Sequence, residues 1–233
     1  MKRAWTRLPS GARLDLINPS PLGWTHSDLV IRLSRTFRWS GESIWPNSLS
    51  VAQHSLTVLA LRQQFSNYTL TPGEALRELL HDGEEGFLGF DAISPLKSEF
   101  GDPFAKISSR LMQAIETRYR LPAWTNESYL IHKQADNIAA AAEAVHCAGW
   151  SVDEARDVLE LRHVPINVDP LAEAFGCNPW EPWEPRLAED RFMAELTGIL
   201  EERPTALFRP VRLLQQDTPF IDTEETRLMS LVG

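Results

Sequence analysis

A mainly α-helical fold of a single domain is predicted by three features of this sequence. Apolar residues recur at helical spacing through most of the chain, a strong helix-start signal occurs at residues 71–74, and only one short segment near the N-terminus is suited to a strand. The 233 residues are enough for one domain with a well-buried core and too few for two independent ones. We therefore expect a bundle of helices around one core.

The first quarter of the chain is expected to pass from an irregular lead-in to two helices. Proline and glycine are frequent in residues 1–24, where a short strand is expected at 12–17. Apolar residues at helical spacing then predict a helix at 26–37 and a second one at 49–66. The loop between them, residues 38–48, contains glycine, proline and asparagine, which favour turns.

The sequence Thr-Pro-Gly-Glu at residues 71–74 predicts the start of the next helix. It combines a hydroxyl cap, a proline at the first helical position and a glutamate in the capping-box position. We expect this helix to run without a break to about residue 88 and to carry His81, Asp82 and Glu85. His81 and Glu85 are four residues apart and would share one face of that helix.

Helical spacing of apolar residues continues in the second half of the chain. It predicts helices at about 103–120, 126–148, 151–160 and 185–201. Residues 203–233 are polar and contain three prolines, which predicts an irregular tail.

These segments predict two parts of one domain. Residues 1–150 are expected to form the helical core that carries the functional site. Residues 151–233 are expected to add C-terminal helices and a Pro- and Trp-rich tail packed on the same domain.

Composition excludes several classes of protein. The formal net charge of −9 argues against a protein that coats duplex DNA, because such binding relies on clustered Lys and Arg. Cys147 and Cys177 form neither a CxxC motif nor a disulfide framework, which fits a reducing cytoplasm. No apolar segment follows the basic N-terminus as it would in a signal peptide, and none is long enough to span a bilayer. We expect a soluble, cytoplasmic protein with no membrane or duplex nucleic-acid partner.

The residues that carry chemistry are His54, the adjacent pair His81-Asp82, and Asp136. Two imidazoles and two carboxylates are a ligand set for a divalent ion such as Mn, Co, Mg, Fe or Zn. All four lie in apolar helical segments, where burial would be costly unless a cation neutralised them. Because they come from three predicted helices, they can meet only inside a bundle, where such metal sites are common.

The order His54, His81-Asp82, Asp136 resembles the H…HD…D pattern of the HD-domain phosphohydrolase superfamily. Three segments are similar to the small bacterial and phage members, which include 5′-deoxynucleotidases and deoxynucleotide triphosphohydrolases. The similarity covers about residues 14–143, and it is carried by the segments Ser50-Val51-Ala52-Gln53-His54-Ser55, Leu80-His81-Asp82-Gly83-Glu84-Glu85 with its continuation to Gly89, and Lys133-Gln134-Ala135-Asp136.

The resemblance implies an HD-domain helical bundle in which those four residues hold one divalent metal. It implies that Glu85 and, beyond the helix, Asp91 assist hydrolysis. It implies that an arginine before the first histidine contacts phosphate; Arg38 matches best, with Arg35 as the alternative. Lys97, in a Pro-Leu-Lys segment, completes the motif as a substrate contact. The chain departs from the family in one respect: Phe90 separates the usual Gly-Asp pair, which puts the role of Asp91 in doubt.

Each of these residues also has an ordinary structural interpretation. Glu85 would then be a solvated helix-face residue, and Asp91 a cap or turn residue. Arg38 would pair with Glu42, and Lys97 would be a surface lysine. An isolated His-Asp dipeptide is common, so the context of all four ligands carries the interpretation.

Nearby residues are expected to be structural. His132 precedes Asp136 by four residues but is expected to be a core or partly exposed histidine. Lys133 is expected to form a salt bridge. For Trp39 and Trp45, in the loop before the helix that carries His54, packing is favoured over stacking on a base.

These observations lead to a metal-dependent phosphohydrolase that acts on a nucleotide, a nucleoside mono- or triphosphate and by resemblance a deoxynucleotide. A phosphodiesterase or alarmone hydrolase remains an alternative, as does a nucleotide-binding sensor without turnover. The family resemblance also leaves a homo-oligomer open.

Overall fold

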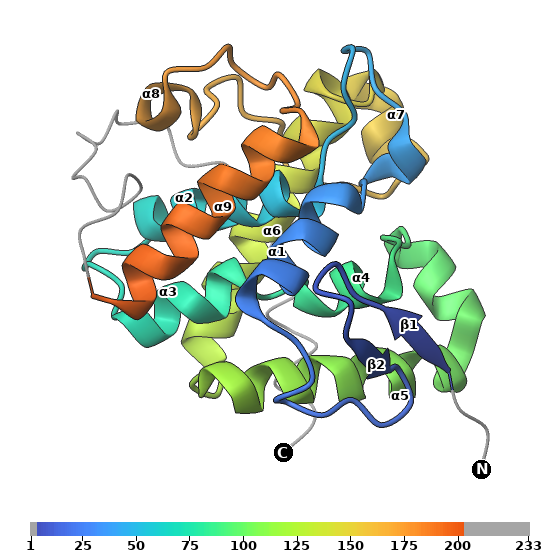
Figure 1. The fold of residues 1–233 in the computed structure, drawn as a ribbon. Helices are drawn as coiled ribbons and strands as arrows, with labels where there is room; N and C mark the ends of the chain where they lie inside the picture. The colour runs from blue at the N-terminus through green and yellow to red at the C-terminus, as the bar shows by residue number, and fades with distance from the viewer. Residues whose placement is uncertain (1–3, 203–233) are drawn as a thin grey trace, which may run out of the picture.

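Most of the chain is helical, as the sequence predicts, and a small antiparallel hairpin precedes the helices (Figure 1). The computed structural model describes residues 4–202, so the predicted tail at 203–233 lies outside the described residues. The elements are β1 (Trp5–Arg7), β2 (Arg13–Asp15), α1 (His26–Arg35), the short 3-10 helix η1 (Trp39–Gly41), α2 (Val51–Phe65), α3 (Pro72–Leu79), α4 (Gly83–Leu88), α5 (Ser94–Tyr119), α6 (Asn126–His146), α7 (Val152–Asp157), α8 (Ala172–Phe175) and α9 (Pro185–Leu200).

Capping boxes fix where four helices begin. The hydroxyl of Thr71 accepts a hydrogen bond from the backbone N–H of Glu74, and the Glu74 carboxylate accepts one from the backbone N–H of Thr71. The same reciprocal arrangement starts α1 at Thr25, α6 at Thr125 and α7 at Ser151. Each box supplies partners for N–H groups that the first helical turn leaves free.

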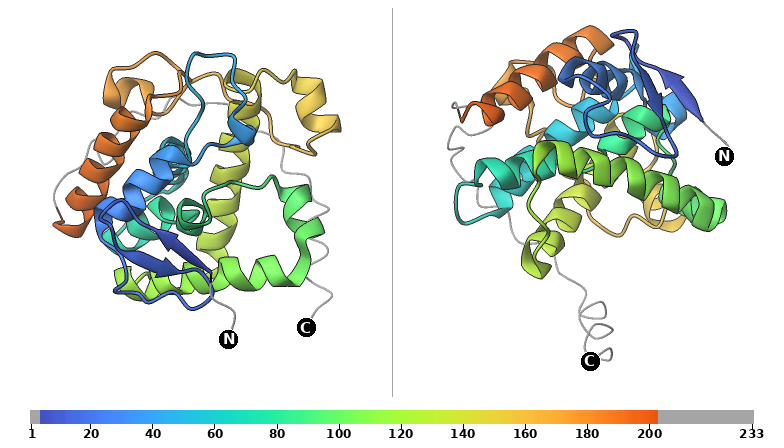
Figure 2. Two further views of the ribbon diagram at one scale, coloured as in Figure 1. Left: turned by 45° about the vertical axis from the view of Figure 1, so that its right-hand side comes forward. Right: turned by 60° about the horizontal axis from the view of Figure 1, so that its bottom comes forward.

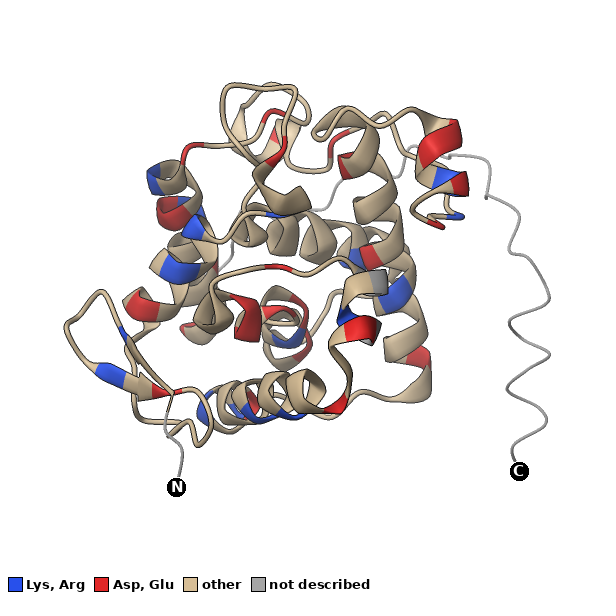
Figure 3. Cartoon of the chain, turned by 90° about the vertical axis from the view of Figure 1, so that its right-hand side faces the viewer, with Lys and Arg blue, Asp and Glu red and all other residues tan. Residues whose placement is uncertain are grey.

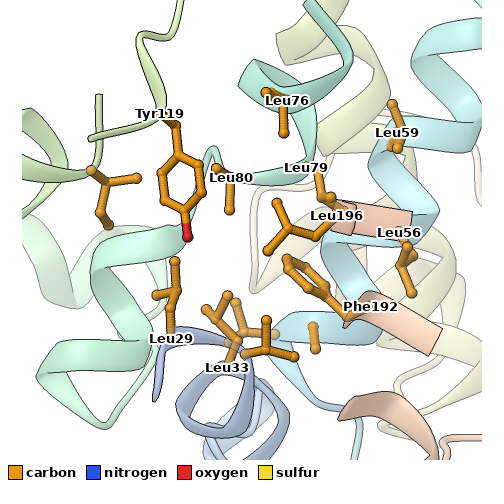
Figure 4. Close-up of a cluster of buried hydrophobic side chains, with 14 of the residues drawn as sticks. Leu29, Leu33, Leu56, Leu59, Leu76, Leu79, Leu80, Tyr119, Phe192 and Leu196 are labelled. Carbon is orange, nitrogen blue, oxygen red and sulfur yellow. The ribbon is translucent and has the colours of Figure 1, made fainter. Parts of the chain in front are cut away.

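The centre of the fold is α2, which is buried from its first residue to Arg62. A helix that is covered on all sides belongs in the middle of a bundle. α6, α3, α1 and α9 all pack against it, and α9 crosses α1 and α3 on the outside (Figure 1). Figure 4 shows the main core between these helices, built from residues such as Leu29, Leu33, Leu56, Leu59, Leu76, Leu79, Phe192 and Leu196.

The predicted helix at 72–88 is wrong in one respect: the chain breaks it into α3 and α4. Leu80 and Asp82 leave the helical region, with φ/ψ of −109°/15° and −107°/25°. The new helix starts at Gly83, where a Cβ atom would lie 2.9 Å from the Ile115 side chain of α5. Glycine therefore lets α4 approach α5. The helical spacing of apolar residues in the sequence gives no sign of that contact.

The sequence also missed part of α5. This helix begins at Ser94 rather than near 103, and Figure 2 shows its two parts meeting at an angle. The bend lies at Gly101, whose φ of 66° and ψ of −164° are outside the helical region, and Pro103 follows. Glycine readily adopts such a backbone conformation, and proline cannot donate a helical hydrogen bond, so the residues explain the bend.

The surface carries mixed charge. In the view of Figure 3, Lys and Arg are interspersed with Asp and Glu and form no continuous basic face among the described residues. Within the described part of the chain, no helix combines the length and the apolar character needed to cross a bilayer.

Candidate metal centre

His54 is fixed from both sides on the central helix. The Ser50 side chain caps α2 by accepting a hydrogen bond from Gln53 N–H, and the His54 side chain one turn later has no exposed surface. Its Nδ1 lies 2.8 Å from Oε1 of Glu143, on α6. Because the carboxylate accepts, the ring hydrogen lies on Nδ1, and the lone pair of Nε2 is free to bind a ligand.

His81 lies in the turn between α3 and α4, and its ring is oriented in the same way. Its Nδ1 lies 2.8 Å from the carbonyl oxygen of Glu78, which can only accept, so this nitrogen carries the hydrogen. Nε2 of His81, like Nε2 of His54, is buried without a hydrogen-bond partner among the described residues. Metal-binding histidines characteristically hold the second nitrogen in this manner.

Asp82 and Asp136 approach these two imidazole nitrogens. Oδ2 of Asp82 lies 3.2 Å from His81 Nε2 and 3.6 Å from His54 Nε2, while Oδ1 of Asp136 lies 3.4 Å from His54 Nε2. His54, His81 and Asp136 each offer an atom within 4.8 Å of the others. Atoms bound to one metal at about 2.1 Å lie roughly 3.0–3.4 Å apart, so His54, His81 and Asp136 fit a shared divalent cation. Asp82 lies against both imidazoles as a fourth candidate ligand.

The break between α3 and α4 is what allows His81 and Asp82 to act together. Adjacent residues of an uninterrupted helix point about 100° apart, because 3.6 residues make one turn. The non-helical backbone at Asp82 instead lets its carboxylate reach the same point as the His81 ring. The predicted arrangement of His81 and Glu85 on one helix face is therefore wrong, since they belong to different elements.

Electrostatics favours additional positive charge at this point. Burial lowers the pKa of His81, but the charge of Asp82 outweighs it and raises that pKa to about 9. Burial raises the pKa of Asp82, but the charge of the facing His81 holds it far below its ordinary value. In Asp136, the facing His54 and the charge of His81 likewise overcome burial and keep the pKa well below normal. A cation that replaces the imidazole protons would stabilise the same ionised carboxylates.

Glu85 is buried beside the cluster and is not the solvated residue that the ordinary interpretation suggested. Its side chain is 2% exposed, Oε1 lies 2.7 Å from Lys97 Nζ, and Oε2 is buried without a hydrogen-bond partner among the described residues. Burial, followed by the charges of Asp82 and Asp91, raises its pKa well above the ordinary value. Glu85 is thus a carboxyl group that holds a proton more tightly than usual next to a group of metal-type ligands.

Arg38 connects the remaining predicted residues. Its Nε donates to Glu143 Oε2 at 2.9 Å, and its Nη1 lies 3.3 Å from Asp91 and 3.8 Å from Asp82. The alternative pairing of Arg38 with Glu42 is not found. Asp91 follows the left-handed cap at Gly89, and its Oδ1 is 3.9 Å from Lys97 Nζ. Arg35, the alternative phosphate contact, is exposed at the end of α1.

Glu143 is the functional candidate that the sequence interpretation did not assign. It is 1% exposed and joins His54 Nδ1 to Arg38 Nε through its two oxygens. Its position seven residues after Asp136, two turns along α6, puts both on one face. That spacing is the sequence signal from which Glu143 could have been assigned to the site. Glu84 was also not assigned; burial and the charge of Asp82 raise its pKa to about 7.

Neighbouring residues have structural roles, as expected. His132 is 5% exposed, bonds Glu78 through Nδ1 at 2.8 Å, and stacks on Trp124. Lys133 lies 2.6 Å from Asp136 Oδ2. The indole N–H of Trp45 donates to the His146 carbonyl, so this tryptophan is engaged in packing.

Comparison with known proteins gives one informative relative. No family model matches the chain. An uncharacterized protein of Rhodobacter capsulatus is 39% identical to it over 158 residues, which cover 66% of this chain and 79% of the relative. The name of that relative states no activity.

Proposed function

This chain belongs to the same family as the uncharacterized Rhodobacter capsulatus protein, and we propose that it is a metal-dependent phosphohydrolase acting on a nucleotide. We also infer that the family belongs to the HD-domain superfamily that the sequence motifs resemble. The observation that carries the proposal is the pair of imidazoles with Nδ1 bonded and Nε2 turned toward two aspartates.

His54, His81, Asp82 and Asp136 would hold the cation. When bound, a divalent cation acts as a Lewis acid toward a phosphoryl oxygen and makes water more acidic. The choice among Mn, Co, Mg, Fe and Zn depends on availability as much as on these ligands.

Glu85 is suited to proton transfer. It is buried, its Oε2 has no hydrogen-bond partner among the described residues, and burial raises its pKa well above the ordinary value. A carboxyl group with a raised pKa is a better proton acceptor and holds a proton that it can give up during a reaction. Lys97 Nζ, at 2.7 Å, holds the carboxyl group in position. Glu85 would accept a proton from the attacking water or give one to the leaving oxygen.

Arg38 is suited to the phosphate. Its guanidinium group is held by Glu143 and reaches toward Asp82 and Asp91. A fixed guanidinium group stabilises the charge that develops on phosphoryl oxygens in the transition state. Asp91 and Lys97 lie in the same ion-pair network and complete the surface that a phosphate would meet.

The test is a panel of ribo- and deoxynucleoside mono-, di- and triphosphates offered to the full chain with Mn, Co or Mg. We expect release of phosphate, pyrophosphate or triphosphate that stops after chelation and returns when metal is restored. Metal content measured on the same sample supplies the control. Bound metal without product from any member of the panel would overturn the proposal.

A further inference from the structure

A groove beside the metal centre has no role in the chemistry described so far. It has a volume of about 510 Å³ and lies between Glu84 of α4 and a face of α5. Lys97 lines the groove and also bonds Glu85, so one side chain connects the groove to the proposed catalytic carboxyl group. This volume is within the range of pockets that bind small molecules.

The lining combines apolar surface with hydrogen-bonding groups. Phe104 and Met112 supply apolar surface, while Ser109 and Gln113 supply polar groups. From residue 105 to 113 the helix rises roughly 12 Å, comparable to the length of a nucleoside. Such a lining suits a flat heterocycle with polar edges better than a second phosphate group.

Glu84 lines this groove and leaves part of its hydrogen-bonding capacity unused. Its Oε1 accepts a hydrogen bond of 3.1 Å from the Ser108 hydroxyl, whereas Oε2 is buried without a hydrogen-bond partner among the described residues. A buried carboxylate oxygen without a donor is unfavourable. The last torsion of a glutamate is soft, so the carboxylate can rotate and present an oxygen to a ligand in the groove.

We infer that the α5 groove binds the base of the nucleotide and that Glu84 selects a base with an exocyclic amino group. This inference rests on the proposed function, because it assumes that the phosphates lie at the metal centre. Carboxylates recognise amino groups of bases by accepting their hydrogens. Adenine carries such a group at position 6 and cytosine at position 4. Guanine, thymine and uracil carry a carbonyl oxygen at the corresponding position, which repels a carboxylate, and the amino group of guanine lies at position 2.

The test measures binding separately from hydrolysis. Manganese-loaded full-length protein with Glu85→Gln, which suppresses turnover, is titrated calorimetrically at pH 8 with the mono- and triphosphates of the four deoxynucleosides. We expect the adenine and cytosine nucleotides to bind at least about tenfold more tightly than the thymine nucleotides. Adding Glu84→Gln is expected to reduce this difference to less than about threefold, because an amide can also donate to a carbonyl oxygen.

A matched control is Glu99→Gln, the same change at an exposed residue of α5 that does not line the groove. It should leave the preference intact. Equal affinity for the four bases, or a preference that survives Glu84→Gln, would overturn the inference while hydrolysis by the wild type would still support the proposed function. A Glu84-dependent preference without hydrolysis by the wild type would support the inference about the groove and overturn the proposed function. Absence of nucleotide binding by the metal-loaded protein would overturn both.

Discussion

Asp28 and Asp82 are two aspartates in sheltered positions with opposite surroundings. Asp28, at the start of α1, is 1% exposed and accepts four hydrogen bonds of 2.7–2.9 Å from the backbone and hydroxyl groups of Ser10 and Thr25. Asp82 faces two histidine nitrogens and an arginine, at 3.2 to 3.8 Å. The first carboxylate has all the donors it needs within the chain, whereas the second has ion-pair partners beyond ideal hydrogen-bond distance.

The difference between the surroundings of Asp28 and Asp82 distinguishes a site that stabilises the fold from a candidate functional site. Groups that satisfy each other, as around Asp28, hold the hairpin segment to α1 and stabilise the fold. The metal-type cluster instead gathers acidic groups and leaves buried nitrogens without hydrogen-bond partners, which costs stability unless a cation binds. Departures from local satisfaction of this kind are expected at functional sites.

The largest predicted effect comes from removing a ligand at the second of these sites. His81→Ala should abolish metal binding and lower hydrolysis by at least about 1,000-fold, because the cation positions and activates the reactants. The variant should remain folded, since the cluster does not contribute to the apolar core. Metal analysis, activity and thermal unfolding of the same preparation check this prediction.

Asp28→Asn serves as the comparison protein in that experiment. It should keep its full metal content and its activity at temperatures where it is folded. If His81→Ala kept both metal and activity, the cluster would not be the metal centre. If His81→Ala and Asp28→Asn lost metal equally, the loss would follow from reduced stability of the fold. The surroundings of Asp28 and Asp82 would then not distinguish a structural site from a metal site.

A smaller loss of activity is expected when a residue beside the metal centre is changed and the proposed metal ligands are kept. Glu85→Gln should retain the metal and lower kcat by about 100- to 10,000-fold, the usual contribution of a proton-transfer group. The amide keeps the size of the side chain but can neither give nor take a proton in the same way. Steady-state kinetics and metal analysis check this, with the exposed Glu99→Gln as control. Loss of metal from a folded Glu85→Gln protein would instead assign Glu85 to the ligand set.

Sequence reasoning predicted the helices with clear local signals. The Thr71 to Glu74 start is confirmed because a capping box acts within four residues. The beginning of α2 at Val51 and of α6 at Asn126 also agree closely with the apolar periodicity. The break before Gly83 was missed because no local signal marks it. The close approach of α4 to the Ile115 side chain likewise involves a residue that is distant in sequence.

In the candidate site too, some residues could be predicted from the sequence and others depend on how distant segments pack. His54, His81, Asp82 and Asp136 were identified together from their residue types and order. The structure groups His54, His81 and Asp136, and it places Asp82 beside the two histidines. Glu143 was missed as a partner of His54, because its role depends on how α6 crosses α2. The substrate itself stays a prediction, since local motifs do not encode the walls of a groove.

The smallest predicted effect concerns Asp28 and its dependence on pH. Burial raises the pKa of Asp28, but hydrogen bonds from Thr25 and Ser10 outweigh this and hold the pKa below its ordinary value. The carboxylate therefore adds stability above the unfolded-state pKa of about 4, and that stability is lost as pH falls through the lower folded-state pKa. Asp28→Asn should reduce the free energy of unfolding by about 1–2 kcal/mol at pH 7 and by clearly less at pH 3, since a protonated carboxyl resembles an amide. Urea unfolding at both pH values measures the difference, and Asp102→Asn, at an exposed position of α5, should show none. A loss for Asp28→Asn that is equal at both pH values would mean that side-chain packing, rather than the charged hydrogen bonds, makes Asp28 stabilising.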